Sequence, residues 1–258
     1  MNLSPDVAIA ISLLGWFVIL AVAKVVTRTE ERGGSGSDAR LVTNFGLTAL
    51  AMLTAALFPL ANVAAAASGA HFGLGIAHSL SMSWVAIFVL TLIVQTLVAY
   101  WVHRWMHRSA LLWRVHRVHH ADSAVDISTS LRKHPVELLV TLPASALVIV
   151  AIGAPVSAVV SVQAIVLAAT IWQHADIRLS APIDRVLGLL IVTPRLHRLH
   201  HNPVPIVHDS NFGELFTVWD RLFGTLSVLD GRGRVGLDDQ SARADDLLEQ
   251  IWSPLRPA

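Results

Sequence analysis

The sequence predicts an all-α membrane protein, a polytopic bundle of about four to five membrane helices that carries a histidine-rich helical cap. Three observations predict this fold. Hydrophobic residues make up 54% of the 258-residue chain and charged residues only 14%, whereas soluble domains carry charge on about 25% of their residues. The hydrophobic residues gather in runs whose lengths approach the roughly 20 residues that cross a bilayer. Most of the histidines gather in short clusters that lie outside these runs.

The first half of the chain holds three of the hydrophobic runs. Residues 7–23 are continuously apolar, with no basic residue before them and no clear A-x-A-like cleavage site after them, so we expect a retained membrane anchor. A polar loop rich in Gly and Ser follows. The second run spans about 41–66 and is interrupted by a proline and an asparagine, and the third spans about 81–102 and leads directly into His103. We expect each run to cross the bilayer.

The second half holds two more runs, 136–152 and 154–172, which meet at a short Gly-Ala-Pro turn. Because this turn is so short, we expect the two runs to form a helical hairpin through the membrane. From Gln173 onward the chain is mostly polar, with one short apolar piece at 186–192. The chain therefore divides into N-terminal membrane anchor helices at 1–80, a histidine-bearing main domain at 81–230 and a C-terminal tail at 231–258.

The positions of the basic residues predict which side of the membrane each segment occupies, because cytoplasmic segments carry an excess of Lys and Arg. If the chain crosses five times with its N-terminus outside, all 19 Lys and Arg lie on the inner side. Four crossings, with two of them re-entrant, give the histidine clusters the same side. We therefore expect a cytoplasmic histidine-rich cap, with His71 and His78 on the opposite side of the membrane.

Eight histidines occur at spacings of three or four residues, which place them on shared faces of helices. Each cluster can aim two or three imidazoles at one point, and neutral imidazole is the commonest protein ligand for metals such as Fe, Zn, Cu and Ni. A catalytic zinc needs about three protein ligands, so this set exceeds the needs of one ion. The clusters, one HxxxH and two HxxHH, comprise His103, His107, His116, His119, His120, His197, His200 and His201.

Other kinds of site are excluded by what the sequence lacks. With no cysteine, the chain has no disulfide, Cys-ligated zinc, iron–sulfur cluster or thiolate nucleophile. No glutamate lies inside a histidine pair, as it does in the HExxH motif of zinc proteases, and the Glu-x-x-His pairs of a carboxylate-bridged di-iron bundle are missing. A net charge of +1 gives no reason to expect a nucleic-acid partner. What remains is a histidine-rich dinuclear metal centre, a dimetal cap at the membrane surface.

Two further histidines are candidate metal ligands. His134 precedes Pro135 and so does not fit inside a helix; we expect it at a helix N-cap, with its ring at the membrane surface facing the clusters. His174 ends the last hydrophobic run at the depth of His107. Three residues of the HDSNFG stretch are expected to surround the ligands, namely His208, Asp209 and Asn211. Asp209 and Asn211 are expected to orient ligand imidazoles through their second N–H, and His208 is expected to lie beside the ligands and not to bind the metal itself.

The motifs HRWMH, HRVHH and HRLHH, in this order and with membrane runs between them, resemble the histidine boxes of the fatty acid hydroxylase/sterol desaturase superfamily. The resemblance covers roughly residues 85–230 and includes LRKHPVE, WQHAD, HDSNFG and WDRLFGT. Members of this superfamily are integral membrane oxygenases with a non-haem dimetal centre. The resemblance implies that the eight box histidines are metal ligands, and the family has a histidine in a setting equivalent to that of His134.

For function, the resemblance implies an O2-dependent lipid hydroxylase or desaturase, a non-haem di-iron oxidoreductase. The implied cofactors are two iron ions and O2, with zinc as an alternative metal in a purified sample. The implied substrate is a membrane lipid, and sterol-like, carotenoid, fatty acyl and ether lipids all fit. Electrons are expected from a separate ferredoxin or cytochrome-type reductase, because the chain has no G-x-G-x-x-G fingerprint, no Cys-ligated cluster and no fused haem domain.

Two non-redox functions are the alternatives. A membrane metal-binding or transport protein is expected to place ionisable residues at mid-membrane, whereas the apolar runs hold little that is polar beyond Gln95 and Gln163. A zinc lipid hydrolase needs fewer ligands and would leave several histidines without a role. Dependence of the activity on iron and on O2 distinguishes the oxygenase from both alternatives.

Overall fold

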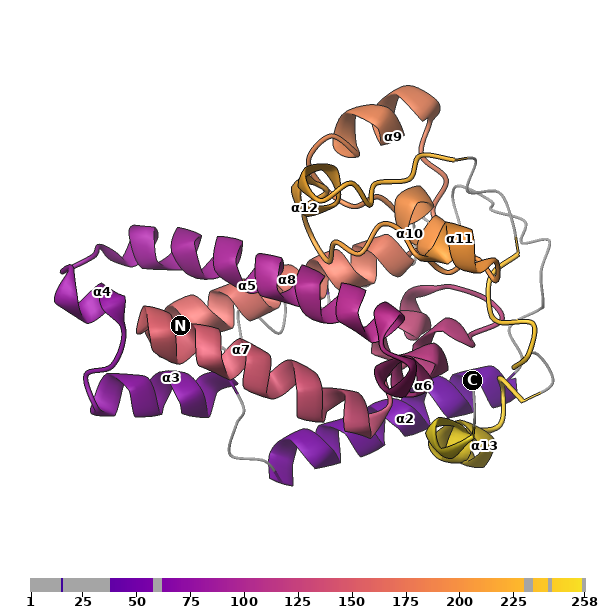
Figure 1. Ribbon diagram of the computed structural model, residues 1–258, viewed down its shortest axis with the longest axis horizontal. Helices are drawn as coiled ribbons and strands as arrows, with labels where there is room; N and C mark the ends of the chain where they lie inside the picture. The colour runs from indigo at the N-terminus through magenta and orange to yellow at the C-terminus, as the bar shows by residue number, and fades with distance from the viewer. Residues whose placement is uncertain (1–14, 16–37, 58–61, 230–233, 241–242, 257–258) are drawn as a thin grey trace.

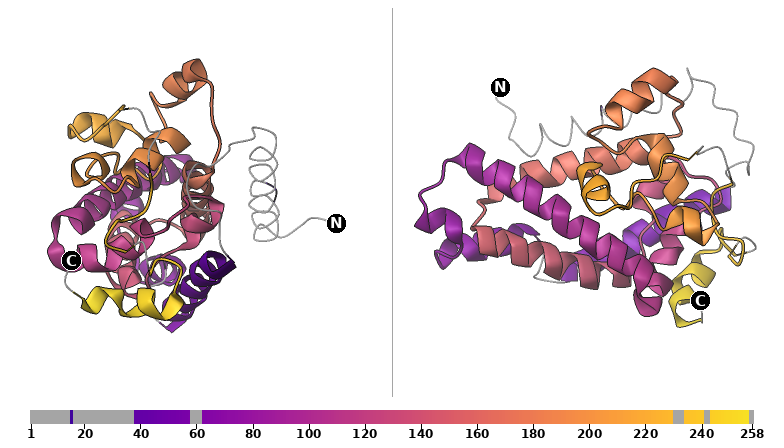
Figure 2. Two further views of the ribbon diagram at one scale, coloured as in Figure 1. Left: turned by 90° about the vertical axis from the view of Figure 1, so that its right-hand side faces the viewer. Right: turned by 45° about the horizontal axis from the view of Figure 1, so that its top comes forward.

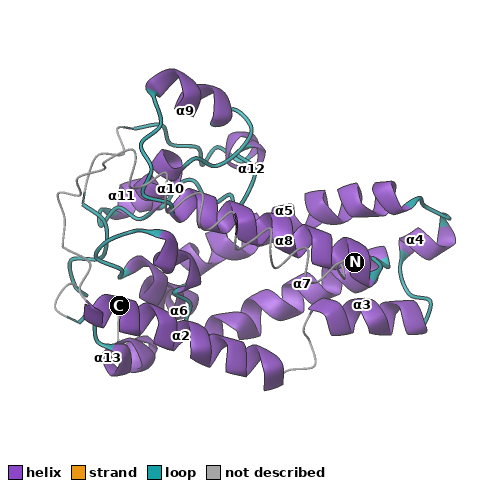
Figure 3. Cartoon of the chain, turned by 180° about the vertical axis from the view of Figure 1, so that it is seen from behind, coloured by secondary structure: helices purple, strands orange, loops and turns teal. Residues whose placement is uncertain are grey.

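The computed structural model of the protein describes residues 15, 38–57, 62–229, 234–240 and 243–256. Within these ranges the chain forms helices joined by loops and contains no β-strand (Figure 3). Ile191 and Phe216 form one isolated antiparallel bridge. The predicted all-α class is therefore confirmed. The apolar run at 7–23, predicted to be a membrane anchor, lies outside the described residues.

Four of the described helices are long and apolar enough to cross a membrane, and the chain is an integral membrane protein. The outer faces of these helices carry large exposed apolar side chains, such as Val85 and Leu147, of which 63% and 72% of the surface is accessible. Water disfavours such faces, whereas the hydrocarbon of a bilayer accommodates them. The candidate spans are Asp38–Ala56, Trp84–Arg108, Pro135–Ile152 and Val156–His174.

The spanning helices lie roughly side by side, with the cap at one end of the bundle (Figure 1). The chain runs away from the cap through α2 and α3, turns at α4 and returns to the cap through α5. It then leaves the cap again through α7 and returns through α8. His71 ends α3 and His78 lies in α4, so both lie far from the cap, as predicted. The helices are α2 (Asp38–Leu57), α3 (Asn62–His71), α4 (Ile76–Ser79), α5 (Trp84–Arg108), α7 (Leu138–Ile152) and α8 (Val156–His174).

Two glycines close the end of the bundle that lies away from the cap. Gly153 ends α7 in the left-handed conformation, at φ +75°, which glycine adopts without strain. Pro155 then begins α8. Gly75, at φ +102°, approaches this turn so closely that a Cβ atom on it would stand 2.1 Å from the Gly153 nitrogen. The predicted hairpin of the last two hydrophobic runs is confirmed.

The cap consists of shorter helices at the ends of α5 and α8, and Figure 2 (left) looks onto it. Ser109 separates α5 from α6, because its hydroxyl accepts a hydrogen bond from the Leu112 nitrogen and so begins a new helix. Thr193 caps α10 in the same way, with Pro194 at the first helical position. The cap helices are α6 (Ala110–His120), α9 (Ala181–Leu187), α10 (Pro194–His200), α11 (Pro205–His208), α12 (Val218–Leu222) and α13 (Leu247–Trp252).

Buried arginines join the cap to α2. Arg40 pairs with Asp122 at 3.1 Å, and Arg132 donates to the side-chain oxygen of Asn44 at 2.8 Å. The two arginines are only 2% and 0% exposed, and buried charges persist where they are paired and hydrogen-bonded. The carbonyl of Arg132 in turn contacts the ring of His119 at 3.1 Å. This polar network therefore positions part of the histidine cluster.

Candidate metal centre

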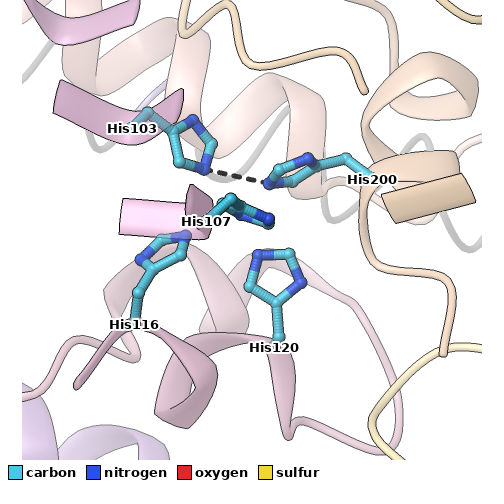
Figure 4. Close-up of side chains that lie close together, drawn as sticks. All are labelled: His103, His107, His116, His120 and His200. Carbon is cyan, nitrogen blue, oxygen red and sulfur yellow. Dashed lines mark hydrogen bonds between the residues drawn. The ribbon is translucent and has the colours of Figure 1, made fainter. Parts of the chain in front are cut away.

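Nine histidines form two adjacent groups where the cap meets the spanning helices. In each group, one nitrogen of every imidazole lies within 4.8 Å of the others, so that each group could hold a metal ion. The five-histidine group, whose rings point towards a common centre in Figure 4, comprises His103, His107, His116, His120 and His200. The four-histidine group comprises His119, His174, His197 and His201.

Each HxxHH motif divides between the two groups. On α6, His116 and His120 join the five-histidine group and His119 joins the other. On α10 the division is reversed, and His200 alone joins the five-histidine group. Residues four apart are rotated by about 40° around a helix and share a face, whereas adjacent residues are about 100° apart. Each motif therefore aims two imidazoles at one point, not three, and sends one to the neighbouring point.

In the five-histidine group, the unprotonated nitrogens of two imidazoles face each other. The Nδ1 atom of His103 lies 2.9 Å from the Phe212 carbonyl, and that of His200 lies 2.8 Å from the Ser210 carbonyl. A carbonyl only accepts, so Nδ1 of each ring carries the proton and Nε2 carries a lone pair. These two Nε2 atoms lie 2.9 Å apart, as the dashed line in Figure 4 marks. The lone pairs repel at this distance, and a cation that both nitrogens coordinate removes the repulsion.

The four-histidine group repeats this arrangement. The Nδ1 atom of His119 contacts the Arg132 carbonyl at 3.1 Å, and that of His174 contacts the Thr170 carbonyl at 2.7 Å. The Nε2 atoms of these two rings lie 3.2 Å apart, and His197 places its own Nε2 2.9 Å from that of His174. Here too the two Nε2 atoms that lack a proton, those of His119 and His174, face each other, as a metal ion requires of its ligands.

Two carboxylates hold further imidazoles of the five-histidine group. Glu137 lies 3.2 Å from Nδ1 of His116, and Asp209 lies 3.2 Å from Nδ1 of His107. The Nε2 atoms of both rings are buried and have no hydrogen-bond partner among the described residues, and neither nitrogen of His120 has one. Carboxylate–imidazole pairs of this kind orient metal ligands and raise their basicity. The orphaned nitrogens fit a metal ion that the group would hold.

Burial favours the neutral form of two cap imidazoles, His119 and His200. Loss of water, and then the neighbouring His174, hold the pKa of His119 well below its usual range. Loss of water, and then the neighbouring His103, do the same to the pKa of His200. At neutral pH these rings therefore carry no charge, which is the form that binds a metal ion. Nine imidazoles in two converging sets fit two metal ions.

The structure does not place His134 with the other candidate ligands. As predicted, it is an N-cap residue, and Pro135 takes the first position of the short 3₁₀ helix that precedes α7. Its Nδ1 atom accepts a hydrogen bond from the Val136 nitrogen at 3.2 Å, and its Nε2 atom donates to the Ile251 carbonyl at 3.1 Å. Both ring nitrogens therefore form hydrogen bonds with the backbone. The prediction that this ring faces the histidine clusters is wrong.

The three residues of the HDSNFG stretch have different positions. Asp209 orients His107, as described above, and His208 lies beside both, with its Nδ1 atom on the Asn202 carbonyl at 2.9 Å. Asn211 contacts no imidazole, contrary to expectation. Its amide group donates to backbone carbonyls of two other segments at 2.9 and 3.1 Å. These bonds fix the loop in which the carbonyls at positions 210 and 212 accept hydrogen bonds from His200 and His103.

Two carboxylates at the site were not predicted from the sequence. Glu137 stands three residues after His134 and was not expected to contact His116. Asp220, in the WDRLFGT stretch, accepts hydrogen bonds from the backbone nitrogens of Phe212 at 2.8 Å and Gly213 at 2.9 Å. Burial raises the pKa of Asp220 above its usual range. Asp220 lies outside the three histidine motifs, so only the resemblance of WDRLFGT to the family could have indicated that it belongs to the site.

A cavity of about 730 Å³ runs from the histidines into the bundle. Its walls come from α2, α3, α5, α7 and α8, and apolar side chains such as Leu138, Leu142 and Leu167 line much of it. Because these helices include the four candidate spans, the cavity lies at membrane depth. The histidines at its cap end are His103, His116, His119, His174 and His197.

Comparisons with known proteins match the same part of the chain. A relative named ornithine lipid hydroxylase OlsE, from Rhizobium tropici, is 30% identical over 138 residues, which are 53% of this chain and 40% of the relative. An alkylglycerol monooxygenase from Danio rerio is 31% identical over 132 residues, 50% of this chain and 28% of the relative. A lathosterol oxidase from Mus musculus is 30% identical over 142 residues, 52% of this chain and 44% of the relative.

The matched region spans less than half the length of each of these relatives. No solved structure matches the chain. A family model described as fatty acid hydroxylase matches residues 88–225, just over half of the chain, and this range contains both histidine groups. The chain therefore belongs to the fatty acid hydroxylase family, within the fatty acid hydroxylase/sterol desaturase superfamily.

Proposed function

We propose that this protein is an O2-dependent lipid hydroxylase or desaturase that holds two iron ions in its two histidine groups. The observation that carries the proposal is the cavity, which begins at five of the nine histidines and continues between membrane helices. A lipid lying in the bilayer has access to this depth without leaving its apolar surroundings. The family match and the names of the relatives support the same class of reaction.

The residues of the site have three tasks in this proposal. The nine imidazoles would hold the metal ions, the carbonyls and carboxylates behind them fix the ring orientations, and the cavity wall would position the lipid and exclude water. Bound iron supplies the O2 chemistry that oxidises an unactivated C–H bond, which no side chain performs. Hydroxylation puts one oxygen atom of O2 into the lipid and reduces the other to water, with two electrons and two protons. We propose a separate ferredoxin or cytochrome-type reductase as their source.

The cavity and the relatives support a proposal for the substrate class. The walls are largely apolar, and the relatives are named for an ornithine lipid, an alkylglycerol and a sterol. These names share a lipid substrate and differ in its chemistry. We therefore propose a membrane lipid as the substrate of this chain.

The test of the function is a comparison of lipids from cells that express this chain with lipids from cells that express a variant carrying both His119→Ala and His120→Ala. These two residues belong to different groups, so the double variant weakens both sites. Under air, we expect a lipid that gains one oxygen atom, or loses two hydrogen atoms, only with the intact chain. Untargeted mass spectrometry identifies that lipid and separates hydroxylation from desaturation.

A matched culture without O2 provides the control. If iron-loaded protein, supplied with a reductase, produces no oxidised lipid, the proposal is wrong. Metal-dependent lipid cleavage would instead support a zinc hydrolase. Metal movement across vesicles would support a transport protein.

We further propose that the cap faces the cytoplasm, because all 19 Lys and Arg fall on its side in the five-crossing arrangement. The chain has no cysteine, so a single introduced cysteine reports its own location. In intact cells we expect a membrane-impermeant maleimide to label Phe72→Cys, beyond the end of α3, and not Asp238→Cys in the cap. The reverse pattern would place the cap outside.

A further inference from the structure

The cavity contains polar side chains far from the histidines. Gln95 on α5, Asn62 on α3 and Ser145 on α7 all line it. Each has a buried polar atom with no hydrogen-bond partner among the described residues, namely Nε2 of Gln95, Oδ1 of Asn62 and Oγ of Ser145. Unsatisfied polar groups are costly at membrane depth, where no bulk water reaches them. Polar residues that persist there mark functional sites.

The three residues lie at a common depth. Gln95 is eight residues before His103 on the continuous helix α5, which places it about 12 Å from His103 along the helix axis at 1.5 Å per residue. Ser145 is eight residues after Glu137, the partner of His116, and lies at about the same depth.

The third residue reaches this depth from α3. A Cβ atom on Gly69 would lie 3.8 Å from the Cα atom of Val150, so α3 and α7 pack together at this point. The two helices run in the same direction (Figure 1). Asn62 lies seven residues before Gly69 on α3, and Pro143 lies seven residues before Val150 on α7, so these two residues are at the same level. Pro143 is within one helical turn of Ser145.

The chemistry of the three groups defines a ligand. The amide nitrogen of Gln95 donates, the side-chain oxygen of Asn62 accepts, and the hydroxyl of Ser145 does both. Three charged residues line the cavity, namely Lys133, Glu137 and Glu214. They lie beside the histidine groups or their hydrogen-bond partners and not at the depth of Gln95, Asn62 and Ser145. An uncharged group that both donates and accepts, a hydroxyl or a secondary amide, matches the set. A hydrocarbon forms no hydrogen bond with any of the three groups, and a carboxylate would find no positive charge beside them.

We propose that Gln95, Asn62 and Ser145 form a hydrogen-bonding site for an uncharged hydroxyl or amide group of the lipid. The site selects lipids that place this group about 12 Å from the carbon presented to the histidines. Binding requires a rotamer of each side chain that turns its polar end into the cavity, because the three polar atoms are buried among neighbouring groups. The proposal rests on the proposed function, because it takes the cavity as the substrate site.

The test measures binding, not turnover. Purified full-length protein in detergent is titrated with three radiolabelled probes of equal chain length, a fatty alcohol, an N-methyl fatty amide and the corresponding alkane. We expect the alcohol, the amide or both to bind about tenfold more tightly than the alkane, as one hydrogen bond between shielded groups provides. Which polar probe binds more tightly identifies the group.

Two variants assign this preference to the site. Gln95→Leu removes the donor at nearly constant size, and we expect it to abolish the tenfold preference. Thr91→Val is the control on the same helix, because the Thr91 hydroxyl already donates to the Ile87 carbonyl at 2.7 Å and does not line the cavity. We expect this variant to keep the preference.

Equal binding of all three probes to the parent protein would overturn the proposal, as would an unchanged preference in Gln95→Leu. These outcomes are independent of the reaction. If no lipid is oxidised in cells but the preference and its loss are observed, the polar site stands and the proposed oxygenase function fails. If a lipid is oxidised but the probes bind equally, the function stands and the polar site fails.

Discussion

Replacing His200 by alanine is expected to reduce lipid oxidation at least about a thousand-fold, because a catalytic metal ion contributes several kcal/mol of transition-state stabilisation. His200 is fully buried, its Nδ1 atom is held by the Ser210 carbonyl, and its Nε2 atom faces that of His103 at 2.9 Å. Without this ring the five-histidine group loses a central ligand. The variant should also lose iron, measured by inductively coupled plasma mass spectrometry of the purified protein.

The matched control is His134→Ala, which removes a candidate that the sequence alone grouped with the ligands. Both ring nitrogens of His134 contact the backbone, so this variant should keep its iron and most of its activity. It should lose about 1 kcal/mol of stability, as other N-cap replacements do. If His134→Ala lost iron as His200→Ala does, His134 would be a ligand and the two histidine groups would be incomplete without it.

The second large effect is expected from filling the cavity. Ala99 lines it on α5, between Gln95 and His103, and a tryptophan there would occupy the path that the lipid takes. We expect Ala99→Trp to lower kcat/KM for the lipid about a hundred-fold or more, since even small displacements of a substrate cost this much. Iron content should not change, because no ligand is altered.

The control for this substitution is Val89→Trp on the same helix. Val89 is 44% exposed on the outer face and does not line the cavity, so a tryptophan there meets lipid and should leave kcat/KM within about twofold of the parent. Steady-state kinetics of both variants on the lipid found by mass spectrometry decide the question. Normal kcat/KM in Ala99→Trp would show that the lipid does not use this cavity.

Much of the fold was predictable because it follows from local sequence. Apolar runs of membrane length mark the spans, and the Gly-Ala-Pro turn after Ile152 marks the hairpin. The eight box histidines were predictable because helical periodicity alone puts residues three and four apart on neighbouring faces. His174 was predictable because it ends a span at the depth of His107, and it joins the four-histidine group.

What the sequence did not predict depends on contacts between distant segments. The ring of His134 turns towards the Ile251 carbonyl, 117 residues away, and not towards the other histidines. The division of each HxxHH motif requires the relative positions of α6 and α10, which no local pattern contains. Asn211 braces a loop against Leu196 and Ser227, and this role appears only once the cap is folded.

The most direct test of the central claim is the metal content of active, purified protein. We expect two iron ions per chain, one in each histidine group. His174→Ala, which alters only the four-histidine group, should reduce this to about one, with loss of lipid oxidation. Full activity with a single metal ion per chain, or with zinc as the only metal, would contradict the account.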